Sequence, residues 1–194
     1  MGRLPVPYGR GVPWQTVSSR VVYENPWITV REDATTTPDG RPGVYGVVEL
    51  RPSVFVVALT DDDEVVLVTV DRYTTGPGSL EVPAGGTDGQ DPLVAAQREL
   101  AEEAGLTARE WTAVGTTEAL NGIARAVEHV FVARGLEPVG DAAATAHEQG
   151  VEGITAVRAV PFGEVLAMVR DGRVRDGETV AALALAALHL GRLA

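Results

Sequence analysis

The chain has 194 residues, enough for one well-packed domain, and no cysteine, which excludes disulfides and thiolate chemistry. Its 16 Lys and Arg against 27 Asp and Glu give a net charge of −11, which argues against a nucleic-acid binder, because such surfaces are normally basic. The chain starts without the apolar core of a signal peptide and its longest apolar run, 180–190, is too short to cross a bilayer, so we expect a cytoplasmic protein that is not bound to a membrane.

The first part of the chain predicts a small sheet. Residues 1–13 are rich in proline and glycine and predict a flexible N-terminal arm. In 14–50, β-rich runs alternate with an Asn-Pro pair and a Pro-Asp-Gly turn, which predicts an antiparallel sheet with strands at 16–23, 27–35 and 44–50. This sheet has few large apolar residues, so we expect it to pack against something else.

The main domain is predicted to span 51–194. Two short apolar runs, 54–59 and 65–70, predict buried strands joined by a charged turn of three aspartates. Three consecutive aspartates could suggest a metal site, but neighbouring residues in a hairpin rarely point the same way. Arg72 follows the second strand, and a glycine-rich connection at 74–79 is predicted to be flexible.

A helix is predicted at 92–104, because an Asp-Pro pair precedes it and a glycine follows it. Glu102 and Glu103 stand three and four residues after Glu99, so the three carboxylates lie within reach of one another and repel unless a cation lies between them. Ligand sets made only of oxygen suit Mg²⁺ or Mn²⁺ better than zinc. Spacing alone favours a solvated acidic face, which is what most glutamate runs on helices are.

The helix and the loop before it carry a specific pattern, Pro83-Ala84-Gly85-Gly86 followed by Arg98-Glu99-Leu100-x-Glu102-Glu103-x-Gly105-Leu106. This pattern resembles the Nudix box of the Nudix hydrolases, which cleave nucleoside diphosphates linked to another moiety. The chain looks most similar to the branch of ADP-ribose pyrophosphatases and nucleotide-sugar hydrolases. It departs from the box in a loop one residue shorter and in Gln90, where the box has a glutamate.

The resemblance implies an α/β fold, the α/β/α Nudix sandwich with a mixed β-sheet, in which the N-terminal sheet often exchanges across a homodimer. It also implies Mg²⁺ or Mn²⁺ held by glutamates 99, 102 and 103, with the carbonyl of Gly85 as a further ligand. Arg98 would orient these carboxylates.

Substrate-binding residues follow from the same resemblance. Arg72 and Glu81 are placed like residues that bind substrate in ADP-ribose pyrophosphatases, although Arg72 could simply be an exposed strand end. Trp27 could stack a nucleobase from the partner subunit or be buried in the dimer contact. The branch also has a proline near the position of Asn121, and its absence weakens the assignment to ADP-ribose.

Beyond the box, strands are predicted at 111–120 and 127–133, joined by a tight Asn-Gly turn. Small polar residues at 140–150 predict a mobile loop. Because related enzymes place a general base or further metal ligand in such a loop, Glu148 and the following Glu152 are both candidates, with a solvated loop as the alternative. His147 is a weaker candidate. A strand at 154–160 and helices at 161–170 and 176–190 complete the chain.

Together these features predict a metal-dependent pyrophosphohydrolase that acts on a small-molecule nucleoside diphosphate linked to a sugar. A hydrolase of nucleoside triphosphates is the alternative among enzymes. A Nudix-fold module that binds nucleotides without turnover is the alternative from another class; Gln90 and the short loop favour it, whereas the three glutamates argue against it.

Overall fold

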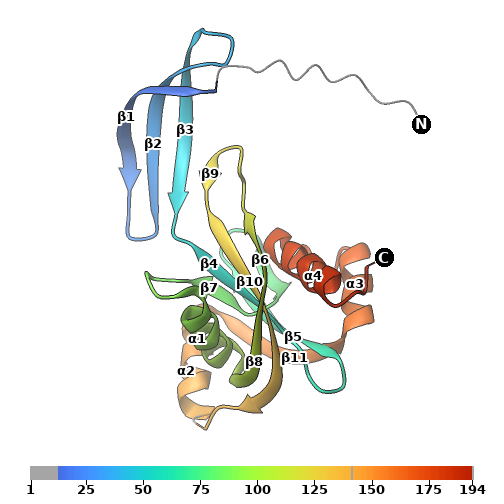
Figure 1. The fold of residues 1–194 in the computed structure, drawn as a ribbon. Coiled ribbons are helices and arrows are strands. Elements are labelled where there is room, and N and C mark those ends of the chain that lie inside the picture. The colour runs from blue at the N-terminus through green and yellow to red at the C-terminus, as the bar shows by residue number, and fades with distance from the viewer. Residues whose placement is uncertain (1–12, 141, 194) are drawn as a thin grey trace, which may run out of the picture. The chain divides into compact units, whose positions relative to one another are not determined.

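The computed structural model describes residues 13–140 and 142–193 and divides them into two compact units (Figure 1). One unit contains the chain up to Leu50 together with Leu120–Arg125, and the other contains Arg51–Ala119 and the chain from Ala126. Except for Pro13, the arm predicted at 1–13 lies outside the described residues. Within the described ranges, no helix is long and apolar enough to cross a membrane.

The N-terminal unit is built on an antiparallel sheet of β1 (Gln15–Glu24), β2 (Ile28–Thr36) and β3 (Pro42–Leu50), as the sequence predicts. The side chain of Asn25 accepts hydrogen bonds from the backbone N–H groups of Trp27 and Ile28, at 2.9 and 2.8 Å, and so closes the turn between β1 and β2.

A fourth strand, β9 (Ala124–Arg125), lies parallel to β3 in the same sheet. Here the prediction of a simple tight turn at 121–122 is wrong, because the chain makes a longer excursion before the next strand begins. Hydrogen bonds to β3 account for the difference: the Val48 N–H donates to the Ile123 carbonyl at 2.9 Å, and the Tyr45 hydroxyl donates to the Gly122 carbonyl at 2.5 Å.

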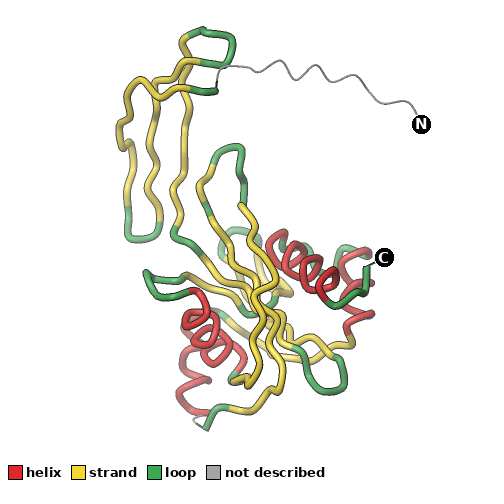
Figure 2. The backbone as a smooth tube through the Cα atoms, viewed as in Figure 1, coloured by secondary structure: helices red, strands yellow, loops and turns green. Residues whose placement is uncertain are grey.

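The second unit contains two sheets (Figure 2). The mixed sheet has the order β7-β4-β10-β8, with β10 parallel to β4 and antiparallel to β8; its strands are Ala84–Gly86 (β7), Ser53–Ala58 (β4), Val127–Pro138 (β10) and Leu106–Glu118 (β8). The antiparallel sheet has the order β11-β5-β6, with strands Ile154–Pro161 (β11), Glu64–Arg72 (β5) and Gly76–Glu81 (β6). The helices are α1 (Pro92–Ala104), α2 (Ala142–Glu152), α3 (Phe162–Arg170) and α4 (Gly177–His189).

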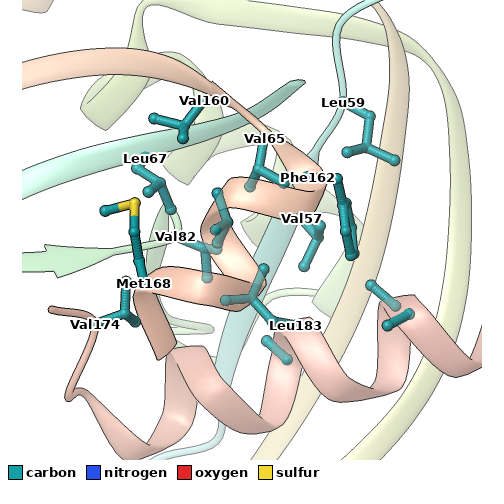
Figure 3. Close-up of a cluster of buried hydrophobic side chains, with 14 of the residues drawn as sticks. Val57, Leu59, Val65, Leu67, Val82, Val160, Phe162, Met168, Val174 and Leu183 are labelled. Carbon is teal, nitrogen blue, oxygen red and sulfur yellow. The ribbon is translucent and has the colours of Figure 1, made fainter. Parts of the chain in front are cut away.

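The core lies on both faces of the mixed sheet, because successive side chains of a strand point to opposite faces. Val56 packs with Leu100 of α1 on one face, whereas Val57 packs with Phe162 and Leu183 of the α3–α4 side on the other. Figure 3 shows the second cluster, with Phe162 and Leu183 beside Val57. The arrangement is the α/β/α sandwich that the sequence predicts.

Two segments predicted to be irregular are ordered elements. The prediction of a loop at 140–150 is wrong, because residues 142–152 form α2. The alanines of this segment explain the helix, since alanine is the best helix former. The prediction of a flexible connection at 74–79 is also wrong beyond residue 75, because β6 begins at Gly76 and pairs antiparallel with β5.

Candidate metal centre and substrate-binding residues

Helix α1 carries the acidic side chains into the interior of the protein. The Asp91 side chain accepts a hydrogen bond from the Leu93 N–H at 2.9 Å, and Gly105 ends the helix with φ of 68°. The apolar face of the helix packs on the mixed sheet through Leu100. Glu99 and Glu103 share this burial, each with only 3% of its surface exposed. Buried carboxylates normally need a partner of opposite charge.

Three carboxylates from two helices meet beside α1. Oxygen atoms of Glu99, Glu102 and Glu152 all lie within 4.8 Å of one another. Glu152 is the last residue of α2 and stands 53 positions after Glu99. Carboxylate oxygens at this spacing fit a hard divalent cation such as Mg²⁺ or Mn²⁺. Of the two loop glutamates proposed from the sequence, the structure thus brings Glu152 into the cluster, whereas Glu148 lies half-buried on α2 and is not one of the three.

The electrostatics of this cluster show an excess of negative charge. The pKa of Glu99 is raised to about 7; burial is the largest cause, Arg98 opposes the rise, and the neighbouring Glu152 and Glu102 add to it. Burial also raises the pKa of Glu103, against the effect of the Ala84 N–H, which donates to its carboxylate at 2.7 Å. A bound cation would remove the cost of ionising these groups.

Gly85 lies directly against the Glu99 carboxylate. It is the middle residue of β7, which pairs with β4, so its backbone position is fixed. A Cβ atom at Gly85 would stand 2.1 Å from Glu99 Oε1, far inside contact distance. Glycine at this position is therefore what lets the carboxylate approach the backbone of β7, where the Gly85 carbonyl is predicted to be a metal ligand.

Arg98 connects the cluster to the loop before α1. Its guanidinium donates to Glu102 Oε2 and to the Gly86 carbonyl, both at 2.8 Å, and lies 2.8 Å from Glu99 Oε1. It also donates to Gln90 Oε1 at 3.3 Å. Gln90 therefore keeps a contact with the arginine although it lacks the negative charge of the glutamate found in the box.

Arg72 and Glu81 form a two-bond ion pair at the ends of neighbouring strands β5 and β6. Arg72 Nε and Nη2 donate to Glu81 Oε1 and Oε2 at 3.1 and 2.5 Å. Glu81 is buried, whereas nearly half of the Arg72 side chain is exposed. The pKa of Arg72 is raised mainly by the hydrogen bonds to Glu81, with further contributions from Glu103 and Asp176. The two predicted substrate-binding residues therefore contact each other, close to the acidic groups of α1.

Trp27 lies in the N-terminal unit, in the turn between β1 and β2, with 73% of its surface exposed. Its role in stacking a nucleobase stays a prediction. His147 is exposed on α2.

A groove of about 570 Å³ borders the loop between β7 and α1. Residues from three separate segments line it, among them Arg51, Asp88, Gln90 and His129. Arg51 Nη1 lies 2.9 Å from Asp88 Oδ1. The sequence offers no signal for such a groove, because His129 falls inside the strand predicted at 127–133 and Arg51 is only the first residue of the predicted main domain.

We predict that affinity for Mg²⁺ or Mn²⁺ rises with pH. The ligands must lose their protons to bind a cation, and the pKa of Glu99 is about 7. The deprotonated fraction of this group therefore grows between pH 6 and pH 8, and the dissociation constant should fall roughly tenfold over that interval. Calorimetric titrations in buffers with different ionisation enthalpies would measure both the affinity and the protons released. A flat profile without proton release would contradict the assignment of Glu99 as a ligand.

Comparison with known proteins finds a matching protein family for each of two parts of the chain. A model of the nucleoside diphosphate sugar hydrolase N-terminal domain matches residues 14–48, and a model of the NUDIX domain matches residues 49–183. The chain is 26% identical over 170 residues to a methanol dehydrogenase activator from Bacillus methanolicus, which covers 87% of this chain and 90% of that protein.

The chain is also 33% identical over 129 residues to an ADP-ribose pyrophosphatase from Mycobacterium tuberculosis, over 66% of this chain and 62% of that protein. A crystal structure of an ADP compounds hydrolase has a TM-score of 0.76, at 21% identity, over 93% of this chain and 97% of its own. That likeness shows a shared fold. With the NUDIX domain match extending over most of its length, the chain belongs to the Nudix hydrolase family.

Proposed function

We propose that the protein is a metal-dependent pyrophosphohydrolase that cleaves a nucleoside diphosphate linked to a sugar, ADP-ribose or a nucleotide sugar. The observation that carries this proposal is the meeting of Glu99, Glu102 and Glu152 within 4.8 Å, next to the backbone of β7. Among them Glu99 is buried and its pKa is raised to about 7, so its ionised form is poorly stabilised without a cation, and perturbed carboxyl groups of this kind are typical of functional sites.

Glu99, Glu102 and Glu103 would hold the divalent ion, with the Gly85 carbonyl as a further ligand, and the Glu152 carboxylate would complete the cluster beside it. When bound, the ion supplies positive charge against the diphosphate oxygens and makes a nearby water easier to deprotonate. Arg98 keeps the carboxylates of Glu99 and Glu102 aligned through its contacts at 2.8 Å.

In the reaction, a water oxygen forms a bond to one phosphorus atom while the bond from that phosphorus to the bridging oxygen breaks. A carboxylate takes the proton of the water, which typically contributes about 10² to 10⁴-fold to the rate. We assign this role to Glu152, because it lies in the cluster, and keep Glu148 as the alternative on the same helix. The two products are a nucleoside monophosphate and a sugar phosphate.

The choice of a nucleoside diphosphate sugar as substrate rests on two supports. The N-terminal unit matches a domain described for nucleoside diphosphate sugar hydrolases, and a relative is named an ADP-ribose pyrophosphatase. The groove beside the loop before α1, at about 570 Å³, is also within the usual size range of pockets for small molecules.

Arg72 would bind a phosphate of the substrate, and its replacement tests this role. We expect Arg72→Gln to raise KM by roughly 10- to 100-fold with a smaller change in kcat, because a charged hydrogen bond contributes about 1.5–3 kcal/mol. Steady-state kinetics on ADP-ribose would measure both constants. The control is Arg158→Gln, an exposed arginine on β11. An unchanged KM for Arg72→Gln would contradict a role in substrate binding and would show that Arg72 serves only as the ion-pair partner of Glu81.

We also propose a homodimer formed through the N-terminal sheet. Strand β1 is the edge of this sheet and is exposed along its whole length, including Val17, Val21 and Tyr23. Unpaired edge strands with exposed apolar side chains favour pairing with a second chain. The partner chain would bring Trp27 toward the nucleobase.

Light scattering should therefore give twice the chain mass of 20.4 kDa for the wild type. Val17→Asp, which places a charge on a residue 71% exposed, should shift the equilibrium toward the monomer. Thr75→Asp, in an exposed turn of the other unit, adds the same charge and should leave the dimer intact. A wild-type monomer at micromolar concentration would contradict the homodimer.

Product analysis tests the function itself. Incubation with ADP-ribose, nucleotide sugars and nucleoside triphosphates, each with Mg²⁺ or Mn²⁺, should yield nucleoside monophosphate and sugar phosphate, identified by chromatography and phosphorus NMR. Monophosphate with pyrophosphate would instead identify a triphosphate hydrolase. Tight nucleotide-sugar binding without metal-stimulated cleavage would identify a sensing module.

A further inference from the structure

Helix α2 contacts α1 through residues that lie along one side of α2. Thr145, Gln149 and Glu152 are spaced four and three residues apart, so they lie along one side of α2. At one end of this row, Thr145 Cγ2 lies 3.1 Å from where a Cβ of Gly105 would stand, so α2 packs closely against the end of α1. At the other end, Glu152 reaches the carboxylates of α1.

Gln149 makes the polar contact between the two helices. Its side-chain Nε2 donates a hydrogen bond to the backbone carbonyl of Glu103 at 2.8 Å. The last four carbonyl groups of a helix have no donor within the helix, and the carbonyl of Glu103 is one of them in α1. Gln149 thus satisfies a backbone acceptor of the residue whose carboxylate lies in the acidic site.

The position of Gln149 links this contact to the cluster. Glu152 follows it by three residues, less than one helical turn, so a shift of Gln149 along α1 would move Glu152 as well. Oxygen atoms of Glu152, Glu99 and Glu102 lie within 4.8 Å of one another, so repulsion between like charges works against the approach of Glu152 to the cluster. A fixed attachment nearby is needed to oppose that repulsion before a cation is bound.

We propose that Gln149 is a positioning residue that holds Glu152 in the carboxylate cluster by anchoring α2 to the end of α1. The proposal rests on the proposed function, since it assigns Gln149 a task in completing the same metal centre. Gln149 does not touch the cluster itself and acts through Glu152.

Gln149→Met tests the anchor, because methionine has a similar length and helix propensity but cannot donate a hydrogen bond. Loss of one ordinary hydrogen bond should weaken Mn²⁺ binding roughly 2- to 10-fold, and should speed amide hydrogen exchange across residues 142–152 by a similar factor. We expect kcat to fall in parallel, with KM changing less than about twofold. The matched control is Gln97→Met, at an exposed position of α1, which should change none of these quantities.

A double-mutant cycle with Glu152→Gln separates positioning from a general effect on the fold. If Gln149 acts through Glu152, adding Gln149→Met to Glu152→Gln should change Mn²⁺ affinity and kcat by less than about 1.5-fold. An equally large loss in that background, or wild-type Mn²⁺ affinity and hydrogen exchange in Gln149→Met alone, would overturn the proposal.

The two proposals can fail separately. A wild-type protein that hydrolyses no nucleoside diphosphate sugar would refute the proposed function. Hydrogen exchange of α2 and Mn²⁺ affinity would still decide whether Gln149 positions Glu152, because neither measurement depends on turnover.

Discussion

Replacing Glu99 with glutamine is expected to abolish metal-dependent hydrolysis while raising the melting temperature of the metal-free protein at pH 8. Both effects follow from the buried carboxylate. Glu99 is 3% exposed and its pKa rises from 4.5 to about 7. Glutamine keeps the shape of the side chain but cannot ionise, so it removes a metal ligand and a buried charge together.

The sign of the stability effect follows from proton binding. A carboxyl group with a raised pKa holds its proton more tightly in the folded state than in the unfolded chain. The folded state therefore loses stability as pH rises from about 4.5 through about 7, by up to about 3 kcal/mol for Glu99. Glu99→Gln avoids this loss, so the variant should melt several degrees higher than wild type at pH 8. At pH 4 the two proteins should melt at similar temperatures.

Thermal melts with EDTA at both pH values measure this difference, and repeating them with Mg²⁺ should stabilise the wild type more than the variant. Hydrolysis should fall at least about 100-fold. We expect Glu103→Gln to lose metal-dependent turnover in the same way, with its fold intact. Glu110→Gln, at an exposed position of β8, serves as the control. Activity within a few-fold of wild type in Glu99→Gln and Glu103→Gln would rule out the metal assignment.

The second large effect is expected from a single methyl group at Gly85. In Gly85→Ala the new Cβ would collide with the Glu99 carboxylate, at 2.1 Å from Oε1 and 2.3 Å from Cδ. Because the Glu99 side chain is buried, its carboxylate can escape only by leaving its place in the cluster. We expect at least a 100-fold loss of kcat and a comparable loss of Mn²⁺ affinity, about 2.7 kcal/mol each.

Gly86→Ala provides a matched control one residue away. A Cβ there would meet Asp88 at 3.6 Å, an ordinary contact distance, and the Gly86 carbonyl could still accept its hydrogen bond from Arg98. This variant should keep activity within a few-fold of wild type. Equal losses in both variants would show that β7 tolerates no side chain at all. The loss of activity in Gly85→Ala would then not result from displacement of the Glu99 carboxylate.

Local patterns in the sequence are sufficient to predict much of the fold. The Asp-Pro pair and Gly105 mark both ends of α1, and the spacing of Glu99 and Glu102 places their carboxylates together. The continuous apolar runs at 54–59 and 65–70 form the buried strands β4 and β5, as the sequence predicts. These features depend on residues a few positions apart, where backbone geometry alone decides which side chains are neighbours.

The remaining features depend on contacts between distant segments. The sequence could not decide between Glu148 and Glu152, because the choice depends on how α2 turns against α1, and the segment was predicted to be a loop. Strand β9 has only two residues and exists because β3 offers a free edge. The groove with Arg51 and His129 forms from segments far apart in the chain, which no local pattern connects.

The excursion at Leu120–Arg125 determines where this chain can be divided for engineering. The N-terminal unit is discontinuous, since its sheet is completed by a strand inserted within the hydrolase domain. A clean cut after Leu50 would leave β9 without its partner strand and remove the Val48 and Tyr45 donors that bond to the Ile123 and Gly122 carbonyls. Chimaeras with other Nudix proteins should therefore exchange residues 14–50 and 120–125 as one module.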